Sequence, residues 1–173
     1  MDQPDYQSDF YQKILQEITL LKQEIREIEQ TVPQTVSLKK KQAGKRLELS
    51  DKFRDLLKYS AARKEIQKAD SLYQEVGSLQ GEANCLQGLA KIKMAQKKYP
   101  EAKKYLEKAK EYYQKIGDQY SLGNNHCLMG DLFQEQGLTS EALREYRAAL
   151  KLFRRIGLKR ETGIIENLMN KLT

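Results

Sequence analysis

The chain has 173 residues, of which 39% are hydrophobic and 32% charged, so it suits one folded domain or a short repeat array with a very polar surface. No apolar stretch approaches the ~20 residues that a membrane span requires, and the acidic, polar first ten residues do not predict a secretory leader. Cys85 and Cys127 show no CxxC spacing, so we expect free thiols in a cytoplasmic protein.

The N-terminal segment, residues 1–35, is acidic and carries a heptad pattern. Residues 8–32 place large apolar side chains at alternating spacings of three and four, which predicts a helix with one apolar seam. Pro33 ends this pattern in a short hinge. The seam needs a partner: the first helix of the following array, a second copy of the chain in a homodimer, or a different protein. The seam residues are Tyr11, Ile14, Ile18, Leu21, Ile25, Ile28 and Val32.

Residues 36–157 contain an internal repeat at an interval of 40 residues. Its clearest sign is the series YQEVG, YQKIG and FRRIG, which ends at Gly77, Gly117 and Gly157. Two columns of alanine keep the same interval: Ala62, Ala102 and Ala142, then Ala69, Ala109 and Ala149. The interval divides the segment into three repeats, at 36–77, 78–117 and 118–157.

Each repeat has the pattern of two helices. In the middle repeat we expect helix A over 79–97 and helix B over 100–116. Pro100 fits the first turn of helix B, and Gly117 fits the left-handed residue that ends a helix. The small residues allow two antiparallel helices to approach closely, while larger residues fill the remaining space.

The motifs of these helix pairs resemble the tetratricopeptide repeat. The middle repeat carries the resemblance at Leu89, Ala90, Tyr99, Pro100, Ala102 and Ala109. MGDLFQEQGLTSEALREYRAAL at 129–150 matches equally well, and LSDKFRDLLKYSAARKEIQKA at 49–69 more loosely. The family unit is ~34 residues, so an interval of 40 implies lengthened helices. This resembles the long variant found in spindle-orienting adaptors, kinesin light chains and bacterial peptide-sensing regulators.

The resemblance implies an all-α fold: a right-handed solenoid of three helix pairs, with an N-terminal helix and a C-terminal capping helix at 158–173. In that last segment Gly163 continues the column of Ala83 and Gly123. A capping helix with a polar outer face is what such arrays need for solubility. The resemblance also implies a non-enzymatic adaptor or scaffold that binds another protein or a peptide.

In the family, helix A of each repeat lines a concave groove that contacts the ligand. The matching positions here are Leu47, Asp51, Arg54, Asn84, Gln87, Lys91, Met94, Asn124, Cys127, Asp131 and Gln134. Amide side chains such as Asn84 and Asn124 can bond a peptide backbone as donor and acceptor. Arg54 and Lys91 suit a carboxylate, whereas Asp131 favours a basic residue. The family's chain-terminus clamp requires several cationic and amide residues in set places. This sequence lacks the full set, so a chain terminus is not predicted as the ligand.

Catalysis, a metal and a cofactor are not predicted. His126 is the only histidine, and its neighbour Cys127 points about 100° away on a helix, so the two do not form a nucleophile pair. No second histidine or nearby cysteine completes a metal site. In the repeat register His126 occupies a packing position.

The alternative function is nucleic-acid binding through the basic faces of residues 39–46 and 91–110. The net charge is +7, and the basic excess belongs to the middle of the chain. A solvated helix surface is the favoured explanation of these charges, because glutamates lie among the lysines and most aromatic residues occupy packing columns.

Overall fold

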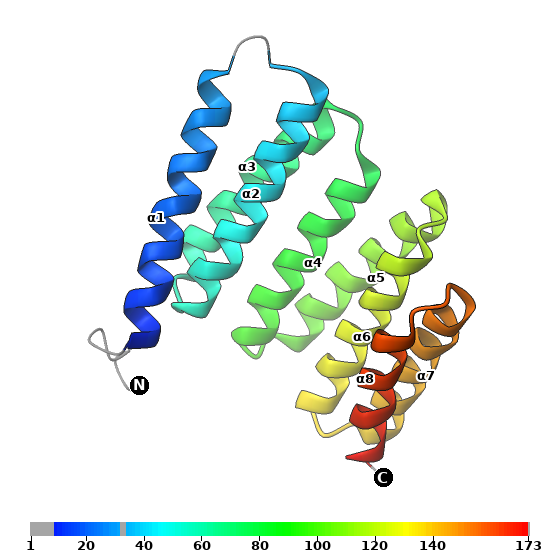
Figure 1. Ribbon diagram of the computed structural model, residues 1–173. Helices are drawn as coiled ribbons and strands as arrows, with labels where there is room; N and C mark the ends of the chain where they lie inside the picture. Colours follow the sequence, from blue (N-terminus) through cyan, green and yellow to red (C-terminus); the bar gives the residue numbers. More distant parts are fainter. Residues whose placement is uncertain (1–8, 32–33, 173) are drawn as a thin grey trace. The chain divides into compact units, whose positions relative to one another are not determined.

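The computed structural model describes residues 9–31 and 34–172, and this part of the chain is built from helices alone (Figure 1). Val32 and Pro33, which we assigned to the seam and the hinge, lie outside the described residues. The helices are α1 (Asp9–Gln30), α2 (Val36–Asp55), α3 (Tyr59–Glu75), α4 (Leu79–Ala95), α5 (Tyr99–Ile116), α6 (Gln119–Glu135), α7 (Thr139–Arg155) and α8 (Lys159–Asn170).

Local chemistry explains where several helices begin and end. Oγ1 of Thr35 accepts a hydrogen bond from the Leu38 amide at 3.2 Å, and the Asp118 carboxylate accepts one from the Ser121 amide at 3.0 Å. Both bonds satisfy amides that have no partner inside their helix. Gly117 ends α5 with a φ of 71°, the left-handed conformation that glycine adopts without steric cost.

The chain divides into two compact units, which meet in sequence between Ile92 and Lys93. In the first unit, α1 and α2 lie side by side in opposite directions (Figure 1). The six predicted seam residues from Tyr11 to Ile28 are all buried. Five of them share one apolar cluster with Leu49 and Leu56, which belong to α2 and its C-terminal end. The seam is therefore covered within a single chain by the first helix of the array.

A second cluster of the first unit joins α2, α3 and α4. Ala62 and Ala69 of α3 have no exposed surface, and Ile66 between them is 1% exposed. Cys85 and Ile92 of α4 complete this cluster. The alanine columns thus lie where the helices pack most closely, as the repeat pattern predicts.

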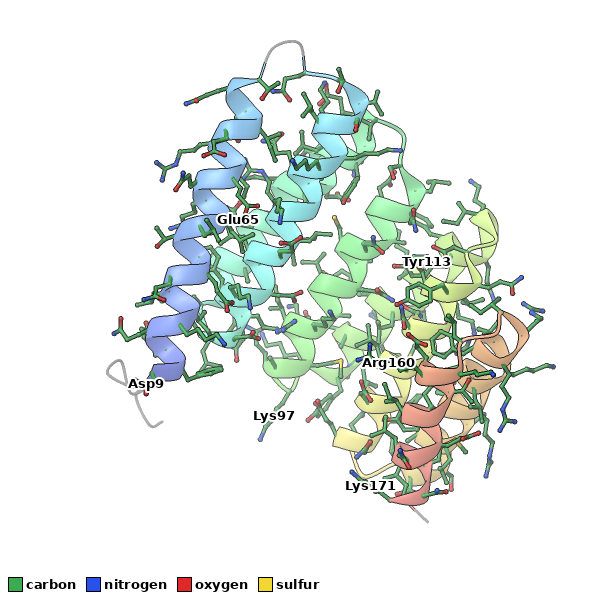
Figure 2. The ribbon with its side chains drawn as sticks, in the orientation of Figure 1. Asp9, Glu65, Lys97, Tyr113, Arg160 and Lys171 are labelled. Atoms are coloured by element: carbon green, nitrogen blue, oxygen red, sulfur yellow. The ribbon has the colours of Figure 1, made fainter. Side chains whose placement is uncertain are left out.

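A buried ion network also ties three helices of the first unit together. Arg46 of α2 is 8% exposed and bonds Glu65 of α3 at 2.6 Å, while its other terminal nitrogen bonds Glu29 of α1. Glu65, labelled in Figure 2, is also 8% exposed. The sequence predicts Arg46 as part of a basic, solvated run. That interpretation is wrong for this residue, because its charge is buried between two carboxylates.

The second unit is built around α5, α6, α7 and α8. Its core contains Tyr113, Tyr146 and Phe153, each at most 1% exposed. Glycines of α6 lie directly against two of these rings. A Cβ atom added at Gly123 would lie 2.5 Å from a ring carbon of Phe153, and one added at Gly130 would lie 2.5 Å from Tyr146. Only glycine allows these helices to approach so closely.

Candidate functional site

The helix-A positions of the first unit come together in one pocket. It has a volume of about 200 Å³ and lies between α2 and α4. We call it the groove pocket. Five of the six residues predicted for this unit line it, and Ser50 and Gly88 complete the lining, so that the full set is Leu47, Ser50, Asp51, Asn84, Gln87, Gly88 and Lys91.

The groove pocket is polar and mixed in sign. Asn84 and Gln87 contribute amides, Lys91 an ammonium group and Asp51 a carboxylate. Gly88 packs closely against α3, since a Cβ atom added there would lie 3.0 Å from Cδ1 of Ile66. Ser50 shares its position in the 40-residue interval with Ala90 and Gly130, a column of small residues, and this column is the signal for its place in the pocket. No such signal distinguished Gly88.

Two predicted groove residues of α2 and α4 have other roles. Arg54 does not line the groove pocket; its guanidinium bonds Asp51 at 2.5 Å and Asp55 at 2.9 Å. Met94 is 8% exposed, so it contributes to packing and offers little surface to a ligand. The burial of Met94 depends on neighbouring helices, which the sequence alone does not place. The Arg54 ion pairs are local, because Asp51 and Asp55 belong to the same helix.

In the second unit the predicted positions lie along α6. Asn124, Cys127 and Asp131 are half-buried, and Gln134 is exposed. The Tyr146 hydroxyl of α7 lies 2.6 Å from Oδ1 of Asp131 and 2.9 Å from Oε1 of Gln134, so it donates to this pair of acceptors. Tyr146 is not among the predicted groove residues, yet its hydroxyl links two of them.

Burial sets the protonation of this part of α6. Desolvation raises the pKa of the Asp131 carboxyl above its ordinary value, and the Tyr146 hydrogen bond opposes that shift. Desolvation and the nearby Asp131 charge raise the pKa of the Cys127 thiol to about 12. A thiol in that state is a weak nucleophile at neutral pH, so Cys127 has the properties of a packing or contact residue.

Replacing Asp131 with asparagine is expected to raise the free energy of unfolding near pH 7, because asparagine carries no charge to desolvate and its oxygen still accepts from Tyr146. The pKa of Asp131 is raised in the folded state, so its penalty develops as the pH rises above the ordinary value of 3.8. The gain should therefore shrink as the pH falls towards 3.8 and disappear below that value. Urea unfolding across this range measures it, with exposed Glu135→Gln as the control. A gain that does not change with pH would contradict the explanation.

His126 bonds a carboxylate of the neighbouring helix. Its Nδ1 lies 2.7 Å from Oε2 of Glu145 on α7, and both side chains are less than one-fifth exposed. This hydrogen bond lowers the pKa of the Glu145 carboxyl. His126 thus helps to pair α6 with α7. Within the described residues, no group of three or more His, Cys, Asp or Glu side chains could hold a metal ion.

The basic stretches at 39–46 and 91–110 are partly neutralised by ion pairs. Lys39 pairs with Glu75, Lys45 with Glu24 and Glu48, and Lys93 with Glu101. None of these contacts favours a nucleic-acid ligand, so that function stays a prediction. Among the described helices, none is both long and apolar enough to cross a membrane.

Comparison with known proteins identifies the repeats. Residues 82–155 match the family model for the tetratricopeptide repeat. No curated protein matches the sequence. The crystal structure of BtubC (BKLC) from P. vanneervenii is similar in fold, with a TM-score of 0.64 and 13% identity; the match covers 92% of this chain and 73% of that chain.

These matches confirm the prediction of an all-α, tetratricopeptide-type fold. At 13% identity the likeness to BtubC shows the fold alone. Tetratricopeptide repeats generally mediate protein–protein interaction and typically act as non-enzymatic scaffolds. Residues 82–155 therefore match the tetratricopeptide repeat family, and the described part of the chain has an all-α fold that agrees with this match.

Proposed function

We propose that this chain is an adaptor or scaffold that holds a peptide segment of another protein against its helix-A faces. The observation that supports the proposal is the groove pocket, where five residues chosen by repeat register line one hollow between α2 and α4. Two of them are amides, which can donate to and accept from a peptide backbone. Lys91 would pair with an acidic side chain of the bound segment, and Asp51 would pair with a basic one.

The α6 face of the second unit would supply a further set of contacts. Asn124 repeats the position of Asn84, and Asp131 and Gln134 present acceptor oxygens held by Tyr146. Each unit offers only a small binding surface. We therefore expect modest affinity, with a dissociation constant on the order of micromolar.

The double variant Asn84→Ala with Asn124→Ala is expected to weaken capture of the partner by about tenfold without unfolding the chain, because it removes backbone-bonding amides from both faces. Affinity capture from native extract measures this, with Gln67→Ala and Gln114→Ala as the matched control. Those two amides are exposed on α3 and α5.

Nuclease treatment of a parallel sample tests the alternative function. The proposal predicts one protein that is captured with and without nuclease and is lost with the groove variant. Material that disappears with nuclease would favour nucleic-acid binding through residues 39–46 and 91–110. Equal capture by wild type and by a folded groove variant would reject the groove as the binding surface.

A further inference from the structure

A larger pocket of about 390 Å³ lies in the first unit among α1, α2 and α3. We call it the three-helix pocket. It shares no lining residue with the groove pocket and uses a different face of α2. Its apolar lining includes Ile25 and Leu49, which are at most 4% exposed, and the half-buried ring of Phe53. The pocket can therefore accept an apolar side chain.

Cationic side chains line the pocket on both sides of this apolar surface. Lys22 and Arg26 of α1 and Lys64 and Lys68 of α3 all line the three-helix pocket, and all four are exposed. Lys68 already pairs with Glu65 at 2.8 Å. Over residues 9–31 and 34–172, the other three form no ion pair with a carboxylate, although Lys22 lies 5.5 Å from the centroid of the Phe53 ring.

The two carboxylates of the three-helix pocket form no ion pair with Lys22, Arg26 or Lys64 among the described residues. Glu29 and Glu65 are both bound by Arg46, which links them across the pocket's inner side. Arg46 itself retains an unused donor, because its Nε is buried and has no hydrogen-bond partner in the described part of the chain. An acceptor oxygen that reached this nitrogen would satisfy a donor that the fold leaves unpaired.

An apolar surface between two rows of cations has a definite chemical complement. We propose that the three-helix pocket binds an acidic segment of a partner protein, with one apolar side chain against Leu49 and Phe53 and carboxylates paired with Arg26 and Lys64. Exposed cations steer such a segment to the surface, and the apolar side chain supplies the buried contact. A nucleic-acid backbone would satisfy the cations but has no aliphatic side chain for this surface.

The probe for the test is a short fluorescein-labelled peptide in which a leucine pair is flanked on both sides by glutamate pairs. A second peptide replaces the leucines with serine, and a labelled single-stranded RNA serves as the competing ligand. Fluorescence anisotropy at near-physiological salt should show binding of the leucine peptide to the full chain. Arg26→Glu with Lys64→Glu should weaken it by at least about tenfold.

The matched control, Lys104→Glu with Lys115→Glu, makes the same change in net charge at exposed sites on α5 and should leave binding unchanged. Arg26→Ser with Lys64→Ser provides a milder variant, with a loss of about threefold, in case the reversed charges disturb the fold. The groove variant Asn84→Ala with Asn124→Ala should also bind the peptide normally, so this test can fail without the groove proposal failing.

Three results would overturn the proposal. The first is absence of leucine-peptide binding, or an equal loss with the control variant. The second is equal affinity for the serine peptide, which would show that the apolar surface takes no part. The third is tighter binding of the RNA that is lost with Arg26→Glu and Lys64→Glu, which would assign the pocket to nucleic-acid phosphates.

Discussion

Replacing Arg46 with alanine is expected to lower the free energy of unfolding by about 3–5 kcal/mol. Arg46 joins α1 to α3 through Glu29 and Glu65, and its removal leaves the buried Glu65 carboxylate with only the exposed Lys68 as partner. Breaking a buried ion pair from one side costs this much because the remaining charge stays desolvated. Urea unfolding followed by circular dichroism measures the change.

The double variant Arg46→Met with Glu65→Gln separates the loss of the ion pair from the cost of leaving the Glu65 carboxylate buried without Arg46. It should be markedly more stable than Arg46→Ala alone, because Glu65 no longer carries a charge and Met fills much of the vacated volume. Lys40→Ala, an exposed change on the same helix, should have an effect within about 0.5 kcal/mol. A loss for Arg46→Ala no larger than for Lys40→Ala would contradict the buried network.

Gly123→Ala and Gly163→Ala should change stability in opposite directions, although the two residues share one column of the repeat. At Gly123 the added Cβ would lie 2.5 Å from the buried ring of Phe153, so a loss of about 1–3 kcal/mol is expected from overpacking. At Gly163 no described atom lies within 4 Å, so alanine should instead add about 0.5–1 kcal/mol through its better helix propensity.

Thermal unfolding of both variants and of wild type measures these two changes in stability. Each variant adds one methyl group to a helix, so each serves as the other's control. A stabilising Gly123→Ala would show that α6 and α7 are not as closely packed at Phe153 as the 2.5 Å distance implies. A destabilising Gly163→Ala would show that a neighbour covers the α8 face.

Repetition in the sequence predicted the packing of the helix pairs well. Ala62, Ala102 and Ala142 form one column, and all three have no exposed surface. A position that is alanine in three successive repeats is kept small by the helix packed against it. That helix is a neighbour in the sequence, so the repeat pattern reveals the contact. The start of α5 at Tyr99 and its end at Ile116 followed from the same logic, since Pro100 and Gly117 determine them locally.

Contacts without a repeated counterpart could not be predicted in this way. The seam of α1 was consistent with three partners, and only the folded chain places it against Leu49 and Leu56. Arg46 was grouped with the solvated lysines, because nothing local to it indicates Glu29 or Glu65 as a partner. Ion pairs between helices depend on the register of one helix against another, which a single sequence does not specify.

The candidate site also contains residues that the repeat pattern predicted correctly and residues that it did not. Repeat register selected five residues that line the groove pocket, because helix A presents the same face in each copy. It also selected Met94, which is buried, and Arg54, which is held by Asp51 and Asp55. The three-helix pocket was not anticipated, since it requires α1 and α3 on either side of α2.

Photo-crosslinking from inside the groove pocket tests most directly whether the partner binds there. A benzophenone amino acid at Gln87, which lines the pocket, is compared with the same residue at exposed Gln114 on α5, each in native extract under near-physiological salt. Gln87 is expected to crosslink to one peptide segment of a partner protein, and Lys91→Glu is expected to abolish the product. Crosslinks from Gln114 with none from Gln87 would show that the partner binds another face and would rule out the groove pocket as the binding site.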